Sequence, residues 1–279
     1  MTANRKKMQG VKFLLIVFAS TVFAVLLHQV HHDPLMTVRT EPQSIIITSG
    51  YFPPVAFASL FVAFCIMGLM FLTIQKTLRG KKLLKSTLFG IALGGMYLVG
   101  MIEAYVVYPV PLFGELYTGL VDGCGILLMS LLLGKYMADD MPDEKRPSGA
   151  TFPAILIIPV IYLLMRYFSY TVINIESSYS TLPAATFLWT AGMGCWVGVM
   201  YMLVGRNICP RNPFNQALVF GGLIFGINWL IYNLFTLIFL GVSVLDLLYR
   251  CIFDSLAVVM GVYVLSFLSR EKAMPPSAD

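Results

Sequence analysis

Charged residues are scarce in this chain. Asp, Glu, Lys and Arg make up 12% of its 279 residues, roughly half the share of a soluble globular domain, and hydrophobic residues make up 58%. The mean hydropathy is +0.81. This composition excludes an ordinary soluble domain. The net charge of +5 comes without aromatic residues interleaved with basic ones on a soluble surface, so we expect no nucleic-acid partner.

Signatures of catalysis and redox chemistry are missing as well. The sequence has no Cys-x-x-Cys pair, no glycine-rich phosphate loop, no His-Glu-x-x-His and no Gly-x-Ser-x-Gly. Its three histidines all fall within residues 28–32, which leaves none at a helix centre to ligate a haem. We therefore expect no cofactor, and a protein without enzymatic activity is favoured. No cysteine lies in a predicted external loop, so we expect no disulfide.

Long apolar segments make up most of the sequence. Eight runs of about 20 residues occur, and each is long enough for a helix to cross a hydrocarbon core of about 30 Å. None alternates as a barrel strand does, and a helix satisfies every backbone amide within the bilayer. We therefore predict an all-α integral membrane protein with eight transmembrane helices, at about 11–29, 51–74, 86–108, 113–135, 152–172, 183–204, 216–240 and 243–268.

Lysine and arginine are distributed unevenly between the loops. The segments on the amino-terminal side of the membrane carry sixteen of them, and the opposite loops carry one, Arg39. Because cytoplasmic loops are enriched in these residues, we predict a cell-membrane protein with both termini cytoplasmic. The first run follows a basic segment, as a secretory signal does. Bulky residues at 26–28 stand where a cleavage site would lie, so we expect an uncleaved first helix.

The two halves of the chain resemble each other. Residues 89–136 align with 221–268 without a gap, and eight of the 48 positions are identical, including Asp122 and Asp254. Because each half has an even number of helices, both halves would enter the membrane in the same direction, as parallel repeats. We predict a 4+4 repeat, with the first repeat at 1–137, a cytoplasmic linker at 138–150, the second repeat at 151–270 and a cytoplasmic tail at 271–279.

Asp122 and Asp254 raise the question of why a membrane helix would hold a carboxylate. Such a charge costs about 2.5–3.5 kcal/mol at the bilayer centre, and it is normally turned inward and paired. The helical rise puts both acids roughly 14–16 Å from the external boundary, near the midplane. Parallel repeats would bring them to equal depth, either facing each other across the axis or each facing its own half.

Five charges fall well inside the predicted helices, namely Glu103, Asp122, Arg166, Arg250 and Asp254. Arg250 and Asp254 are four residues apart and can pair within one helix. Arg166 can meet Glu103 or Asp122. Three acids against two arginines leave one acid that is either protonated or meets a cation.

Polar residues on the seventh helix extend this set. Asn228 and Tyr232 add hydrogen-bonding groups in its outer half. Together the polar residues predict a cavity that opens outward and is lined by the third, fourth, fifth, seventh and eighth helices. The alternative is a network that only locks the helices in register, as many buried ion pairs do. The candidate residues for binding a substrate or ion are Asp122, Asp254, Glu103, Arg166, Arg250, Asn228 and Tyr232.

The histidines cluster where the first helix leaves the membrane. His28, His31 and His32 are followed by Asp33, and imidazoles with a carboxylate can ligate zinc or copper. No second cluster supplies the missing ligands. We therefore favour a solvated cap at the membrane interface and expect no metal, with these histidines as weak candidates.

Three classes of function stay open. The favoured one is a small permease or ion-coupled transporter with an acidic site near the bilayer midplane. The second is a non-catalytic membrane subunit, sensor or assembly factor that acts through helix contacts. The third is a membrane enzyme acting on a lipid, with Glu103, Asp122 and His28 as candidates. The expected partners are the lipid bilayer and a small solute or cation, and a homo- or hetero-oligomer is left open.

Overall fold

The computed structural model describes residues 3–30, 43–78, 80–108, 110–140, 151–207 and 212–271. These residues form a bundle of helices without a strand, and eight spans are long and apolar enough to cross a membrane. The prediction of an all-helical protein with eight helices long and apolar enough to span a membrane is confirmed. The helices of the first half are α1 (Ala3–Val30), α2 (Ile45–Thr48), α3 (Phe52–Ile74), α4 (Lys82–Val107) and α5 (Leu112–Met137).

The second half begins with α6 (Thr151–Phe168), which continues into the π-helix η2 (Ser169–Ile173). It then has α7 (Pro183–Leu203) and the short 3-10 turn η3 (Gly205–Asn207). The seventh span is built from three segments in sequence, α8 (Pro213–Ala217), the π-helix η4 (Leu218–Gly226) and α9 (Ile227–Phe239). The last helix is α10 (Val244–Glu271).

Proline defines where several spans begin. Pro53, Pro183 and Pro213 each lie in the first turn of a helix, where a missing backbone N–H costs nothing. Asn212 precedes the last of these prolines, and its side chain accepts a hydrogen bond from the Phe214 amide. The starts of these spans therefore follow from local chemistry as well as from hydropathy.

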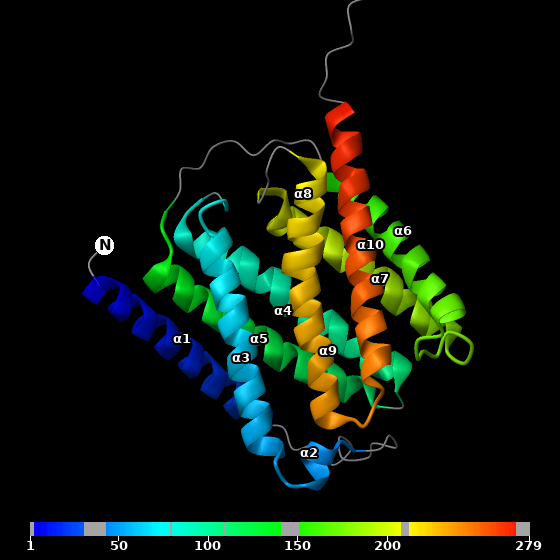
Figure 1. Cartoon of the computed structure of the whole chain (residues 1–279), viewed down its shortest axis with the longest axis horizontal. Helices are drawn as coiled ribbons and strands as arrows, with labels where there is room; N and C mark the ends of the chain where they lie inside the picture. The colour runs from blue at the N-terminus through cyan, green and yellow to red at the C-terminus, as the bar shows by residue number, and fades with distance from the viewer. Residues whose placement is uncertain are drawn as a thin grey trace, which may run out of the picture.

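The helices pack in a pattern that is similar in the two halves. In the first half α1 runs along α5, and in the second half α6 runs along α10 (Figure 1). Between the halves, α4 packs against α7 and α3 against α9. Small residues allow the closest approaches: a Cβ added to Gly94 would lie 3.0 Å from the Gly123 carbonyl oxygen, and one added to Gly198 would lie 2.8 Å from that of Ala154.

The bundle has two ends, which we call the α2 end and the terminal end. The α2 end carries α2 and the turns that lead into α5 and α10, at the bottom of Figure 1. The terminal end carries the start of α8 and the end of α10, at the top of the same view.

Hydrogen bonds join the ends of α3, α4 and α5 at the terminal end, around the buried ammonium group of Lys85. Its Nζ donates to the backbone oxygen of Gln75 (2.7 Å) and to the side-chain oxygen of the same residue (3.0 Å). The Asp140 carboxylate accepts from the Lys82 amide at 2.8 Å. The turn between α3 and α4 is thereby tied to the end of α5.

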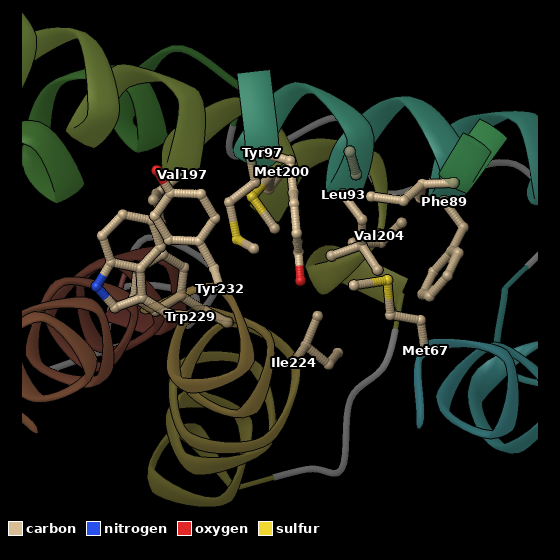
Figure 2. Packing of buried hydrophobic residues seen from close by; sticks show 14 of the residues in the cluster. Met67, Phe89, Leu93, Tyr97, Val197, Met200, Val204, Ile224, Trp229 and Tyr232 are labelled. Carbon is tan, nitrogen blue, oxygen red and sulfur yellow. The ribbon is translucent and has the colours of Figure 1, made fainter. Parts of the chain in front are cut away.

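The core lies where the two halves meet. Figure 2 shows side chains of α4, α7 and the η4–α9 span packed together, with Trp229 and Tyr232 side by side. The Trp229 and Tyr232 rings are stacked with centroids 4.8 Å apart, and the Tyr97 ring meets Tyr232 edge-on at 5.4 Å. These aromatic residues belong to the core, and Trp229 also contacts the polar residues described next.

Candidate functional site

Four of the five charges that were predicted to lie inside helices form one buried network. Arg166 of α6 makes ion pairs with Glu103 of α4 and with Asp254 of α10. Arg250 of α10 pairs with the same Glu103 carboxylate. All four side chains are buried, and the network joins α4, α6 and α10.

Neighbouring groups satisfy most of the remaining hydrogen-bonding capacity around Arg166 and Asp254. Trp229 Nε1 donates to Asp254 Oδ2 at 2.7 Å, and Arg166 Nε donates to the Tyr170 hydroxyl at 3.0 Å. The Arg166 guanidinium also lies over the Trp189 ring, 4.9 Å from its centroid. A buried charge with this many partners is stabilised in place, and removal of one partner leaves the others uncompensated.

The pairing of Arg250 differs from the one expected. We expected it to pair with Asp254 one turn later, but its Nη2 donates to Asp246 Oδ2 one turn earlier, at 3.0 Å. It also donates to the backbone oxygen of Glu176 at 2.7 Å. The reason is that Asp254 already accepts from Arg166 and Trp229. Of the two acids that we considered as partners for Arg166, Glu103 and Asp122, it pairs with Glu103.

Asp122 stands apart from this network. Its Oδ1 lies 3.0 Å from Nε2 of His28, near the end of α1, and the two side chains are 18% and 33% exposed. The Tyr117 hydroxyl donates to the Leu27 carbonyl oxygen at 2.9 Å and holds the end of α1 against α5. The acid left over by the arginines therefore has an imidazole as its partner.

A cavity of about 530 Å³ lies beside Asp122. Its lining runs from the helix ends at the α2 end, including Phe52 and Phe239, to residues about half way along the bundle, including Met67 and Ile126. A volume of this order suits a small organic ligand. The polar or charged lining residues are His28, Gln29, Tyr97, Glu103, Tyr108, Glu115, Thr118, Asp122, Tyr232, Asn233, Thr236 and Arg250.

The helices around this cavity are not all those expected. Among the described residues the lining comes from α1, α3, α4, α5, α9 and α10, whereas the fifth span, α6, contributes none of it. The reason is that Arg166 turns into the buried network. Asp254 turns the same way and stays outside the lining. The first two spans, α1 and α3, were not expected in the lining, and they supply His28 and an apolar wall respectively.

Of the two predicted polar residues on the seventh span, one reaches the cavity. Tyr232 lines it, and its hydroxyl donates to the Met101 sulfur at 3.4 Å. Asn228 is buried outside it and donates to the Ile224 carbonyl oxygen at 2.6 Å. Asn228 therefore lies outside the cavity lining, and its amide nitrogen also donates to the Met70 sulfur of α3 at 3.3 Å.

Tyr97 is a lining residue that the sequence analysis did not single out. Its side chain is buried, yet no described residue lies within hydrogen-bond distance of its hydroxyl oxygen. The available signal was a lone hydroxyl in the middle of an apolar span, which is weak because most membrane tyrosines pack or face lipid. Its position next to the cavity became visible only with the neighbouring helices in place.

Of the three histidines that were weak candidates for binding a metal, one lies among the described residues. His28 is bonded to Asp122, whereas His31 and His32 lie outside the described residues. Within the described ranges no group of three or more His, Cys, Asp or Glu side chains could hold a metal ion.

Comparisons with known proteins give no further guide to the site: no protein-family model, no curated protein sequence and no solved structure matches this chain.

Proposed function

We propose that this polytopic membrane protein is a small permease or ion-coupled carrier that binds its solute in the cavity beside Asp122. The observation that supports this proposal best is the cavity itself, which is large enough for a small solute and has an intramembrane carboxylate at its wall. Asp122 is the main cation-binding group. Asp254, which we first placed beside it in that role, is assigned to the structural network with Arg166, Glu103 and Arg250.

The arrangement of the two ends agrees with a carrier in one of its conformations. The cavity lining reaches the α2 end and extends only about half way along the bundle, whereas hydrogen bonds of Lys85, Gln75 and Asp140 hold the ends of α3, α4 and α5 together at the terminal end. With both termini cytoplasmic, as the distribution of lysine and arginine favours, this is an outward-facing state. Transport then requires the terminal end to open while the α2 end closes around the bound solute.

A parallel 4+4 repeat is part of the proposal. Its support is that α5 and α10 begin 132 residues apart, which is also the offset between Asp122 and Asp254. Gly94 approaches Gly123, and 132 residues later Gly226 approaches Ser255. Carriers built from two such halves bind their solute near the bilayer midplane, between helices that can rearrange.

The test is transport by the purified full chain in proteoliposomes on a solid-supported membrane. Concentration jumps of Na⁺, K⁺ and a panel of organic ammonium salts should produce a transient current with at least one of them. Asp122→Asn should abolish that current, and Asp139→Asn, which removes the same charge from the exposed end of α5, should leave it unchanged. Currents that survive Asp122→Asn for every responsive solute would overturn the assignment.

A second candidate, a membrane enzyme acting on a lipid, is supported by one observation. His28, Asp122 and Glu103 all line the same largely apolar cavity, and the hydrogen bond between His28 and Asp122 has the geometry of a general base with its orienting carboxylate. Chemical change of lipid in vesicles that contain the protein, lost in His28→Gln, would favour the enzyme over the carrier.

A further inference from the structure

We propose that the cavity binds an organic ammonium ion that carries an N–H group and an apolar, preferably aromatic, body. This inference names the substrate class of the carrier proposed above and rests on that proposal for its physiological role. It is argued from the charge of the lining, from its apolar wall and from the buried hydroxyl of Tyr97.

The charge of the lining favours a cation over an anion. Its acids are Glu103, Glu115 and Asp122, and its bases are Arg250 and His28. Glu103 and Arg250 pair with each other within the buried network, so their charges offset. Asp122 lies beside the His28 imidazole, and the described lining contains no lysine and no arginine other than the paired Arg250. An anionic head group would therefore find no unpaired lysine or arginine among the described lining residues, whereas a cation would find the partly exposed Asp122 carboxylate.

The apolar wall favours an organic cation over an inorganic one. Most of the lining is hydrocarbon, and a bare metal ion in about 530 Å³ would leave that surface facing water. Aromatic rings also attract an ammonium group placed over their faces. The aromatic lining residues are Phe52, Phe57, Phe64, Tyr97, Tyr108, Tyr232, Phe235 and Phe239.

Tyr97 indicates that the ammonium group carries a hydrogen. A buried hydroxyl without a partner is unfavourable, and Tyr97 is 4% exposed with no described group in hydrogen-bond range of its oxygen. A primary or secondary ammonium in the cavity has an N–H group to donate to this oxygen, and Tyr97 and Asp122 both belong to the lining. A quaternary ammonium has no N–H group to donate.

The experiment measures binding to the full chain in lipid nanodiscs by isothermal titration calorimetry. The probes are 2-phenylethylammonium, its neutral counterpart 2-phenylethanol, and the quaternary ion benzyltrimethylammonium. We expect saturable binding of 2-phenylethylammonium, at least 30-fold weaker binding of 2-phenylethanol, and intermediate affinity for benzyltrimethylammonium, with each ratio setting a free-energy difference. This comparison needs no variant, so it does not depend on the folding of any substitution.

Two variants locate the site. Asp122→Asn should weaken binding of 2-phenylethylammonium at least tenfold, whereas Asp139→Asn should not change it. Tyr97→Phe should weaken 2-phenylethylammonium three- to tenfold and leave benzyltrimethylammonium unaffected, because the quaternary ion does not use the hydroxyl. Equal affinity for the ammonium and the alcohol, or undiminished binding by Asp122→Asn, would overturn the inference.

Comparing the binding and transport experiments distinguishes the proposed ligand class from the proposed transport activity. Binding of the organic ammonium in nanodiscs without any current in proteoliposomes would support the site and contradict transport. Currents with Na⁺ or K⁺ that depend on Asp122, together with no binding of organic ammonium ions, would support transport and contradict the substrate class.

Discussion

Two acid–base pairs occupy matching places in the two halves of the molecule. His28 of α1 meets Asp122 of α5, and Arg166 of α6 meets Asp254 of α10. In each half the first long helix supplies the base and the last helix supplies the acid. The two acids also lie at the same distance along their helices, ten residues after Leu112 and after Val244.

The surroundings of the two pairs differ completely. The side chains of Arg166 and Asp254 are 0% and 2% exposed and have several further partners, whereas those of His28 and Asp122 are 33% and 18% exposed at the wall of a cavity. The two acid–base pairs therefore have different roles although they occupy equivalent positions. We assign the dry pair to stability and the accessible pair to binding, and the experiments below test this division.

The largest effect is expected from Arg166→Met. It leaves Glu103 and Asp254 with buried charge and fewer partners, and the loss of one member of a buried ion pair costs about 3–5 kcal/mol. Unfolding of the purified protein, followed by tryptophan fluorescence against increasing dodecyl sulfate in mixed micelles, measures this loss. Lys135→Met, at an exposed position on α5, is the control and should change stability little. A loss below about 1 kcal/mol for Arg166→Met would contradict the structural role of the network.

The next effect compares the two aspartates directly. Asp254→Asn keeps an acceptor for Trp229 but removes the charge that pairs with Arg166, and should cost about 2–3 kcal/mol, near the upper range for a hydrogen bond to a charged group. Asp122→Asn should cost less than about 1 kcal/mol, because its pair is partly exposed. The same unfolding assay checks both. Equal losses for the two variants would remove the division between a dry and an accessible pair.

A glycine series tests the packing beside each pair. In Gly94→Ala the new Cβ would lie 3.0 Å from the Gly123 backbone, which cannot rotate away, so we expect a loss of about 1–3 kcal/mol. In Gly226→Ala it would meet the Ser255 hydroxyl at 2.8 Å, on a side chain that can turn aside, and one backbone atom, the Gly221 carbonyl oxygen, at 3.0 Å, whereas all three nearest atoms in Gly94→Ala belong to the Gly123 backbone. The loss should therefore be smaller in Gly226→Ala. Gly222→Ala is the control, since nothing lies within 4 Å and alanine favours the helix. A larger loss at Gly226 than at Gly94 would contradict this order.

The helices could be predicted from the sequence because hydropathy and length decide them. The eight spans were expected within a few residues at most ends, and all are present among the described residues. The irregular backbone of the seventh span was not foreseen. Its π-helix, Leu218–Gly226, is a matter of hydrogen-bond register, which an apolar composition does not determine.

The site could be predicted only in part. The inventory of buried charges named the members of the network, since a charge inside an apolar run needs a partner whatever the fold. The pairing of these charges was harder to predict, because Arg250 has an acid one turn away on both sides. It pairs with Asp246 because Asp254 is already paired with Arg166. The cavity depends on contacts between distant helices, such as that of α1 with α5, which no local pattern encodes.

The smallest effect on stability is expected from His28→Gln, and it tests the comparison most sharply. A pair this exposed contributes about 0–1 kcal/mol, and glutamine can still donate one hydrogen bond to Asp122. Unfolding should therefore be nearly unchanged, while the affinity for 2-phenylethylammonium should hold or rise, because the carboxylate loses a competing base. If His28→Gln instead destabilised the protein as much as Arg166→Met does, His28 and Asp122 would form a second structural lock. The Asp122 carboxylate would then not be available to a cation, and both acid–base pairs would serve only to stabilise the fold.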